Sequence, residues 1–238
     1  MRKFLNLIKR SLFYERWTCN SCGKEIFGGY FCKDCMDKLI EIDHNRCNFC
    51  GRRTPYPVSY CDSCSGKNLS FDSARSVYEY TPVLSGVIQN FKYNNARYHA
   101  RFFAEKLFEI YKDLGVSVDV VTFVPLSEKR EKDRGYNQSK LIAKEFCKLS
   151  GVELLDCVFK IRETDSQAKL NFEGRVKNLK GAFKADKKLV KNRSVLLIDD
   201  VLTTGSTANA VSKALKSAGA TKVTVLTVAS ISKTVFYD

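Results

Sequence analysis

Eight cysteines stand in four Cys-x-x-Cys pairs near the amino terminus, a spacing with which proteins present thiolates to a metal ion. CNSCG returns as CNFCG after 28 residues, and FCKDC is echoed by YCDSC after 29, so the segment holds two copies of one small unit. Four thiolates fill a tetrahedral zinc site and leave no position for a reactive water. We therefore predict two structural zinc ions, with these ligands: Cys19, Cys22, Cys32, Cys35, Cys47, Cys50, Cys61 and Cys64.

The distribution of these cysteines over the two ions has two solutions. The repeat favours serial sites, 19/22/32/35 and 47/50/61/64, whereas a crossed arrangement, 19/22/47/50 and 32/35/61/64, uses the same residues. A disulfide framework is the competing interpretation. Lys9 and Arg10 interrupt the apolar run at the start of the chain, however, and no small-residue cleavage site follows, so we expect no secretory signal. Disulfides are rare in the reducing cytosol, and we therefore expect metal ions instead.

The segment VLLIDDVLTTGST, residues 195–207, combines two kinds of binding group. An apolar strand ends in Asp199 and Asp200, whose carboxylates can accept hydrogen bonds from the vicinal hydroxyls of a ribose. A turn with successive backbone N–H groups and hydroxyls, suited to phosphate, follows at a helix start: Thr203, Thr204, Gly205, Ser206 and Thr207. Such residues also make ordinary caps and turns, but adjacent buried aspartates are costly unless something binds them. The segment therefore predicts a site for a 5-phosphorylated ribose.

The elements that must position this site alternate along the chain. Continuous or alternating apolar runs predict strands at 74–80, 118–126, 152–161, 194–202 and 221–230. Helical periodicity predicts helices from Pro82 and over 99–114, 137–151 and 207–219. Strands separated by helices of this length indicate a parallel sheet with helices on both faces, in which ligands bind beyond the carboxyl ends of the strands.

Several motifs in this order resemble the ComF family of competence-associated proteins, whose domain is similar to type I phosphoribosyltransferases. The matching stretches are VPLSEKREKDRGYNQS, RETDSQAKL, GRVKNLKGAF and LLIDDVLTTGST, and the paired cysteines resemble the family's zinc ribbon. The resemblance covers nearly the whole chain. It implies an α/β fold, with a type I phosphoribosyltransferase-like parallel sheet flanked by helices and preceded by a small zinc-ribbon domain. The expected units are a basic amphipathic segment at 1–18, the cysteine domain at 19–66 and the phosphoribosyltransferase-like domain at 70–238.

The resemblance also assigns roles at the site. It implies that Asp199 and Asp200 take the ribose hydroxyls with magnesium nearby, and that Thr203 to Thr207 surround the 5-phosphate. Further basic and polar side chains are implied in the pyrophosphate loop and in a mobile loop: Lys129, Arg130 and Arg134, then Arg162, Gln167 and Arg175. Asp199, Asp200, Arg130 and Arg134 are the expected catalytic residues. Singly, each basic residue has an alternative as a solvated surface charge.

The resemblance to the ComF family implies a protein that binds phosphoribosyl pyrophosphate and acts in DNA uptake during natural transformation, where it handles incoming single-stranded DNA beside machinery at the inner membrane. If it is an enzyme, it transfers the phosphoribosyl group to an acceptor, but the sequence exposes no acceptor pocket. Two alternatives stand beside this one. The chain could be a non-catalytic nucleic-acid-binding or adaptor protein with phosphoribosyl pyrophosphate as its ligand, or a phosphoribosyltransferase of nucleotide salvage.

The charge of the chain points to polyanionic partners. Its formal net charge is +14, and residues 129–193 hold 18 basic against 9 acidic side chains, which we expect to form a rim around the phosphate site. Basic and aromatic residues alternate at 46–57 and 91–103, a pattern that fits single-stranded DNA, although Phe91, Phe102 and Phe103 have the spacing of core residues. No apolar run approaches the roughly 18 residues of a membrane span. We expect a cytoplasmic protein that contacts the inner membrane peripherally, if at all, through its amphipathic start.

Overall fold

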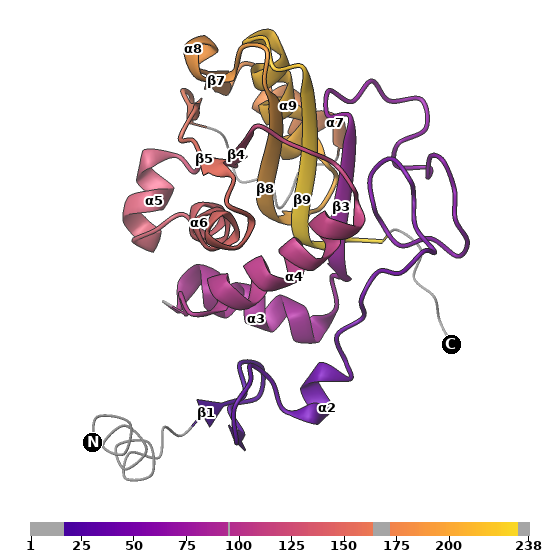
Figure 1. Cartoon of the computed structure of the whole chain (residues 1–238), viewed down its shortest axis with the longest axis vertical. Coiled ribbons are helices and arrows are strands. Elements are labelled where there is room, and N and C mark those ends of the chain that lie inside the picture. The colour runs from indigo at the N-terminus through magenta and orange to yellow at the C-terminus, as the bar shows by residue number, and fades with distance from the viewer. Residues whose placement is uncertain (1–16, 95, 164–171, 233–238) are drawn as a thin grey trace.

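The computed structural model describes residues 17–94, 96–163 and 172–232, which fold around a five-stranded parallel sheet (Figure 1). The strands follow the order β3-β9-β8-β4-β5, and each neighbouring pair runs parallel. The strands are β3 (Ser73–Glu79), β4 (Val120–Phe123), β5 (Glu153–Leu154), β8 (Ser194–Leu202) and β9 (Lys222–Ser230). The inner strands β4, β8 and β9 are buried along almost their whole length, as their apolar runs predict. The expected parallel sheet with flanking helices is confirmed.

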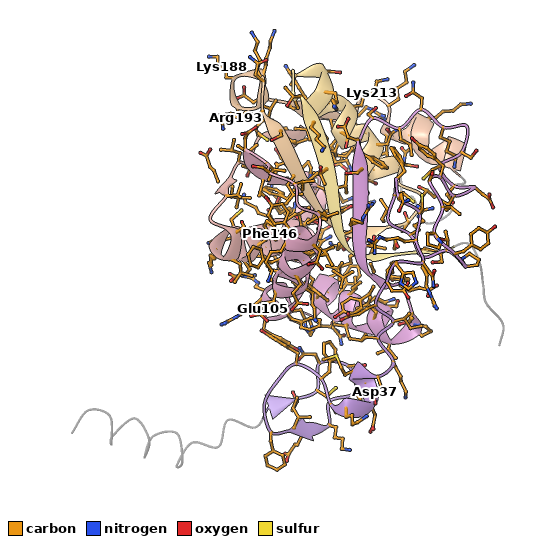
Figure 2. The ribbon with its side chains drawn as sticks, turned by 45° about the vertical axis from the view of Figure 1, so that its right-hand side comes forward. Asp37, Glu105, Phe146, Lys188, Arg193 and Lys213 are labelled. Atoms are coloured by element: carbon orange, nitrogen blue, oxygen red, sulfur yellow. The ribbon has the colours of Figure 1, made fainter. Side chains whose placement is uncertain are left out.

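One face of this sheet is covered by α3 (Pro82–Tyr93), α4 (His99–Asp113) and α6 (Gln138–Ser150). Helix α3 starts at Pro82, as predicted, and the Thr81 hydroxyl accepts a hydrogen bond from the Leu84 N–H at 3.4 Å. Phe146 of α6 lies inside this layer with no exposed surface (Figure 2). The Asn137 side chain caps α6 by accepting from the Lys140 N–H at 3.1 Å. The Asn137 side-chain amide also donates to the Val124 carbonyl at 3.0 Å, which holds the first turn of α6 against the end of β4.

The opposite face carries α9 (Ser206–Ser217) and α7 (Phe172–Leu179). Helix α9 begins directly after the turn that follows β8, and its residues Val211 and Leu215 are fully buried against the apolar side chains of β8 and β9. The strand, the turn and the helix thus form one continuous unit. It places the predicted phosphate-binding turn at the carboxyl edge of the sheet.

The single strand predicted at 152–161 is wrong, because the chain divides there into two short strands. Strand β5 joins the sheet beside β4, and the Leu155 N–H still bonds to the Val121 carbonyl at 2.8 Å. Strand β6 (Val158–Lys160) leaves the sheet and pairs antiparallel with β7 (Phe183–Ala185). The pairing stops although β4 continues to Phe123, because the Leu155 carbonyl accepts from the Thr122 hydroxyl at 2.9 Å instead of from a backbone N–H of β4.

A short helix, α5 (Glu128–Arg134), stands where the sequence predicts a pyrophosphate loop after the first buried strand. The Ser127 hydroxyl accepts from the Arg130 N–H at 3.4 Å at its start, and Gly135 ends it with a φ of 80°. A second short helix, α8 (Lys187–Val190), precedes β8. Both helices contain residues of the basic stretch 129–193, and they lie at different ends of the sheet.

That separation corrects the expected basic rim. Lys188 and Arg193 stand before β8 begins, at the amino edge of the sheet, and Lys213 lies on α9 towards the same end (Figure 2). Part of the positive surplus therefore faces away from the phosphate-binding turn. The cause is topological, since the chain must return to the amino edge before it can start another parallel strand.

Residues 17–39 form the first cysteine module, with β1 (Trp17–Thr18), β2 (Glu25–Ile26) and α2 (Lys33–Met36). Tyr30 and Phe31 of this module pack on Phe102 of α4, with ring centroids 4.9 and 5.0 Å apart. The Tyr30 hydroxyl also donates to Glu105 at 3.3 Å, on the side of α4 that faces the module (Figure 2). The first module therefore adds to the core on the α4 face of the sheet.

Residues 43–66 form the second cysteine module, which packs beside β3 and shares a core with β8 and α9. The Ala74 N–H of β3 donates to the Phe49 carbonyl at 2.7 Å. The connector between the modules pairs with the outer edge of β3, where the Ile42 N–H bonds to the Val77 carbonyl at 2.8 Å. This connector covers an edge that would otherwise expose unpaired backbone groups.

The boundaries at 66 and 70 stay a prediction, as does the segment 1–18, of which residues 1–16 lie outside the described part. Within the described ranges, none of the helices has both the length and the apolar content to cross a bilayer.

We predict that Gly51→Ala destabilises the chain far more than Gly23→Ala, the equivalent position of the other repeat. Both glycines have left-handed φ values, 70° and 75°, so each alanine costs about 1–2 kcal/mol in backbone strain. A Cβ at Gly51 would also lie 2.6 Å from the Ala74 carbonyl oxygen and from Arg75 Cα, whereas nothing lies within 4 Å of one at Gly23. Thermal unfolding of both variants checks this, and equal losses would contradict the contact with β3.

Candidate functional site

Asp199 and Asp200 lie near the carboxyl end of β8 and are only 9% and 6% exposed. The Ser139 hydroxyl donates to Asp199 Oδ1 at 2.9 Å, and the Gln138 side-chain amide donates to Asp200 Oδ2 at 3.2 Å. The Lys92 ammonium lies 2.6 Å from the same Asp200 oxygen. The start of α6 and the end of α3 therefore meet at the carboxylate pair, and each contributes a donor to it.

The two carboxyl groups differ in pKa because only one of them has a cation beside it. Burial, and next the charge of Asp200, raise the pKa of Asp199 to about 7. Burial acts on Asp200 in the same direction, but the charge and hydrogen bond of Lys92, together with the hydrogen bonds from Gln138 and the Val201 N–H, outweigh it and lower the pKa of Asp200. At neutral pH Asp200 is ionised and paired with Lys92. Asp199 titrates near this pH, so a bound cation or hydroxyl group would change its protonation state.

The turn at 203–207 connects β8 to α9, and its shape depends on Gly205. Gly205 has a φ of 81°, in the left-handed region that favours glycine. The hydroxyls of Thr204 and Ser206 bond to each other at 2.8 Å, and the Ser206 N–H donates to Thr204 Oγ1 at 3.3 Å. Within the described residues, the N–H groups of Thr204 and Gly205 donate to no acceptor. The turn thus presents two adjacent backbone donors at the start of a helix, the arrangement that binds anions.

Of the three basic residues expected in the pyrophosphate loop, which lie on α5, Arg134 contacts the side chains around the carboxylate pair. Its guanidinium donates to the Gln138 side chain, which in turn holds Asp200, and it stacks over the Tyr93 ring at 5.0 Å. Arg130 is half-buried and Lys129 is exposed. Burial, and next the positive charge of Arg130, lower the pKa of Lys160, while the carboxylate of Glu163 acts in the opposite direction and Arg162 adds a smaller lowering.

The predicted mobile-loop residues are described only in part. Arg162 is exposed, and its guanidinium donates to the Asn178 and Lys180 carbonyls at 2.7 and 3.0 Å, so that it ties the start of this stretch to the end of α7. Gln167 lies outside the described residues, and of Arg175 only the place on α7 is described. The ligand-binding roles of these three residues stay predictions.

Three residues at the pair were missed by the sequence reasoning: Lys92, Gln138 and Ser139. A signal existed for Gln138 and Ser139, because both stand in the RGYNQS stretch that carries the family resemblance. No comparable signal marked Lys92, which precedes Asp200 by more than a hundred residues and is one of many lysines. Its role depends on how α3 packs across the end of the sheet.

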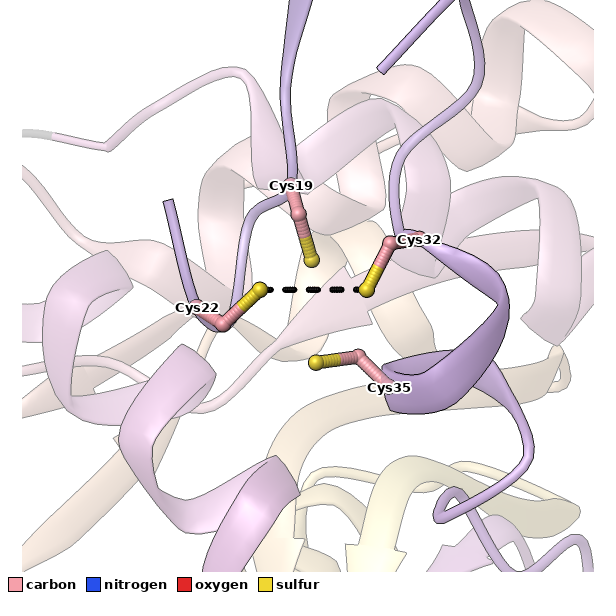
Figure 3. A group of neighbouring side chains, drawn as sticks. All are labelled: Cys19, Cys22, Cys32 and Cys35. Carbon is pink, nitrogen blue, oxygen red and sulfur yellow. Dashed lines mark hydrogen bonds between the residues drawn. The ribbon is translucent and has the colours of Figure 1, made fainter. Parts of the chain in front are cut away.

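The cysteines gather into two clusters, and the grouping is the serial one. The first cysteine cluster consists of Cys19, Cys22, Cys32 and Cys35, whose sulfur atoms face a common centre (Figure 3). The second cysteine cluster consists of Cys47, Cys50, Cys61 and Cys64. Neighbouring sulfur atoms lie 3.7 Å apart between Cys22 and Cys32 and between Cys50 and Cys61. All ten cysteines are free of disulfides, and each cluster could hold a metal ion.

A cavity of about 670 Å³ lies between α9 and β7, apart from the carboxylate pair. Ser206 stands at its edge, and its floor is mostly apolar, with Phe183, Ala210 and Ala214. Four exposed lysines line it: Lys180, Lys184, Lys187 and Lys213. None of these four ammonium groups forms an ion pair with another described residue. We call this feature the lysine groove.

The aromatic residues of the stretch 91–103 divide between core and surface. Phe91, Phe102 and Phe103 are buried, which confirms the core role expected from their helical spacing. Tyr93 and Tyr98 remain exposed. The surface of this stretch therefore offers two rings instead of five.

The amino-acid sequence is similar to a known protein domain and to several known proteins. The profile of the phosphoribosyl transferase domain matches residues 112–235. Competence protein F of Haemophilus influenzae is 30% identical over 202 residues, which cover 82% of this chain and 87% of that protein. Competence protein ComFC of Streptococcus pneumoniae is 30% identical, with coverages of 81% and 84%. DNA utilization protein YhgH of Salmonella typhimurium is also 30% identical, with coverages of 75% and 81%.

We predict that Asp199→Asn and Asp200→Asn change thermal stability in opposite directions at pH 8. Because the folded-state pKa of Asp199 is raised, its buried charge costs stability above pH 7, and this cost disappears as pH falls towards 4. Asp199→Asn should therefore raise the melting temperature by a few degrees at pH 8 and much less at pH 5. Asp200→Asn leaves the Lys92 ammonium without its carboxylate partner and should therefore lower the melting temperature at pH 8. Equal shifts at both pH values for Asp199→Asn would contradict its raised pKa.

Proposed function

The chain belongs to the ComF family and carries a phosphoribosyl transferase domain, and from this membership we propose that it binds phosphoribosyl pyrophosphate at Asp199, Asp200 and the 203–207 turn. The observation that carries the proposal is the junction of a buried carboxylate pair with a turn that has two open N–H donors. The carboxylates would accept the ribose hydroxyls, and the turn would surround the 5-phosphate. One continuous strand–turn–helix unit supports both contacts.

Magnesium is the cation that we propose beside Asp199 and Asp200, because carboxylate and phosphate oxygens are the ligands it prefers. When bound, it would neutralise part of the negative charge of the diphosphate. The chain's own cations support the same ligand, since the Arg134 guanidinium donates to the Gln138 side chain, which in turn donates to Asp200. Arg130 is close enough to Lys160 to lower its pKa, and a pyrophosphate group beside the two would relieve that repulsion.

In a phosphoribosyl transfer, a nucleophile forms a bond to ribose C1 while the bond from C1 to the pyrophosphate oxygen breaks. The electron pair leaves with the pyrophosphate, and positioned guanidinium groups such as those of Arg130 and Arg134 would stabilise its charge. We infer that the chain supports this reaction if an acceptor is present. A measurement of pyrophosphate release distinguishes a salvage-type transferase, which releases it, from an adaptor that only binds phosphoribosyl pyrophosphate.

We propose that both cysteine clusters hold zinc. A zinc–sulfur distance of about 2.3 Å in a tetrahedron puts the sulfur atoms about 3.8 Å apart. The sulfur distances of 3.7 Å for Cys22–Cys32 and 3.7 and 3.8 Å for Cys50–Cys61 and Cys61–Cys64 fit that geometry. Each zinc would hold together a module that has too few apolar residues for a core of its own. A cytoplasmic location, where thiols stay reduced, accords with these sites.

A second proposed property is the binding of single-stranded DNA, which fits the competence and DNA-utilization names of the relatives. The lysine groove favours it, because four ammonium groups that form no ion pair within the described part of the chain border an apolar floor that includes one aromatic ring. Backbone phosphates are attracted by such charges, and bases stack on such surfaces. We infer that the chain receives DNA beside the uptake machinery at the inner membrane, and that the lysine groove is the contact.

Calorimetric titration tests the first proposal. The parent chain should bind phosphoribosyl pyrophosphate with magnesium present and much more weakly with EDTA. Asp199→Asn and Asp200→Asn should each weaken binding by about tenfold or more, since each removes a charge-assisted hydrogen bond to the ribose. Asp156→Asn is the matched control, because Asp156 pairs with Lys140 at 2.7 Å on the surface. Binding without any dependence on magnesium, with both site variants equal to the parent, would exclude the site.

Fluorescence anisotropy with an oligothymidylate tests the second proposal. The double variant Lys184→Ala, Lys213→Ala should lower the slope of log affinity against log salt by about 1.4, since each contact to a single-strand phosphate contributes about 0.7. The double variant Lys38→Ala, Lys144→Ala removes the same charge from exposed positions outside the groove and should leave the slope nearer to the parent value. Identical slopes for both double variants would remove the groove from the DNA contact, and no binding at low salt would remove the function.

A further inference from the structure

Arg52 links the second cysteine cluster to the candidate ligand site. It follows Cys50 and Gly51, and its carbonyl accepts a hydrogen bond from the Cys47 N–H at 2.8 Å, so it is the last residue of the turn that carries two of the cluster's sulfur atoms. Its side chain nevertheless reaches the turn after β8, and the whole residue is only 4% exposed. The guanidinium Nη2 donates to the Thr203 carbonyl, at the first residue of the 203–207 turn.

The environment of this guanidinium is unusual for a buried charge. Among the described residues Arg52 has no carboxylate partner, and its Nε has no hydrogen-bond acceptor. A buried cation without a counter-charge is costly. Four thiolates around one divalent ion carry a net charge of about −2, and the second cysteine cluster begins five residues before Arg52 in the same turn. The cluster on one side and a ligand phosphate on the other would both offset the charge of Arg52.

The hydrogen bond from Arg52 to the Thr203 carbonyl affects the Thr204 N–H, one of the two donors proposed to bind the phosphate. Peptide bonds in the described chain are trans, so the N–H of Thr204 points opposite to the Thr203 carbonyl that Arg52 holds. A cation at the carbonyl polarises this peptide and makes its N–H a stronger donor. It also fixes the plane of the peptide, and therefore the direction of the N–H. Gly205 and the Thr204–Ser206 hydrogen bond fix the turn through contacts among its own residues. Arg52 adds a contact from the second cysteine module, at the carbonyl of Thr203.

The module that carries Arg52 is itself anchored to the sheet. Gly51 lies so close to β3 that a Cβ would meet the Ala74 carbonyl oxygen at 2.6 Å, and Cys47, Cys50 and Cys64 belong to the same buried core as Leu202. Among the described residues, the first cysteine module has no contact with the 203–207 turn, and its aromatic side chains pack on Phe102 of α4 instead. The two clusters are repeats in sequence, but only the second one reaches the 203–207 turn.

We propose that Arg52 is a positioning residue through which the second cysteine cluster holds the 203–207 turn in the conformation that receives a phosphate. For the identity of the ligand this inference rests on the proposed function, whereas the coupling between cluster and turn does not. Loss of metal from the second cluster therefore loosens the ligand site, and loss of metal from the first cluster leaves it intact.

Amide hydrogen exchange of the full, metal-loaded chain tests the coupling without any ligand. In the segment 200–212, the Asn209 N–H bonds to the Gly205 carbonyl at 2.8 Å and reports opening of the turn. Arg52→Gln should speed exchange there by about tenfold, the effect expected for a lost hydrogen bond to a charged group, while the zinc content stays at two per chain. Arg53→Gln is the matched control, because Arg53 stands in the same module and pairs with Glu79 at 3.0 Å. Unchanged exchange in Arg52→Gln would overturn the proposal.

A pair of cysteine variants gives a second, independent measurement. Cys61→Ser and Cys32→Ser remove the third ligand of the second and the first cluster respectively, and each should lower the zinc content by one per chain. Only Cys61→Ser should speed exchange in 200–212. Equal exchange in both variants would overturn the coupling even if Arg52→Gln failed to fold.

Calorimetry with phosphoribosyl pyrophosphate then separates this inference from the proposed function. Arg52→Gln should weaken binding by about tenfold relative to Arg53→Gln. A parent chain that binds no phosphoribosyl pyrophosphate would refute the proposed ligand, and the exchange results would still decide the coupling. A parent that binds it as tightly as Arg52→Gln does would show that Arg52 does not position the phosphate donors.

Discussion

Two carboxylates stand next to each other at the buried end of the central strand, and their mutual repulsion is the constraint around which the site is arranged. Such a pair is tolerated in the interior only when cations and hydrogen-bond donors surround it. Lys92 arrives from the end of α3, and Gln138 and Ser139 arrive from the start of α6. The packing of both helices on one face of the sheet is therefore also what makes the carboxylate pair possible. The same arrangement leaves Asp199 without a cation of its own, which is where a ligand or metal ion would complete the site.

The cysteine modules extend this organisation because neither has a sufficient core of its own. The first one places Tyr30 and Phe31 against α4 and joins the core on that face, while the second one joins the core of β8 and α9 on the other. The connector between them covers the edge of β3. Two copies of one sequence unit thus serve different elements, and the asymmetry arises from their docking and not from their ligands. Only the copy beside β3 contacts the turn that follows β8.

Much of the fold was predictable from particular residues. The β-branched runs of β8 and β9 and the periodic helices α3, α4, α6 and α9 lie where the sequence placed them, because apolar periodicity is a local property that burial reinforces. Prediction failed at 152–161, where the Thr122 hydroxyl takes the Leu155 carbonyl and the chain leaves the sheet to pair with β7. It also missed α5, whose charged sequence has almost no apolar face and which is held by its caps. The expected basic rim was wrong in part because sequence proximity says nothing about which edge of a sheet a residue occupies.

By itself, the sequence determined the chemistry that was available: eight thiolates in pairs, two adjacent aspartates, and a Thr- and Gly-rich turn at a helix start. These are short-range patterns, so a few residues are enough to define them. The tertiary structure alone decided which groups those residues meet. The serial grouping of the cysteines, the pairing of Lys92 with Asp200, and the contact between Arg52 and Thr203, which are 151 residues apart, all depend on how distant elements pack. Such contacts leave no periodic or spacing signal in the chain, because the packing of whole helices and strands brings them together.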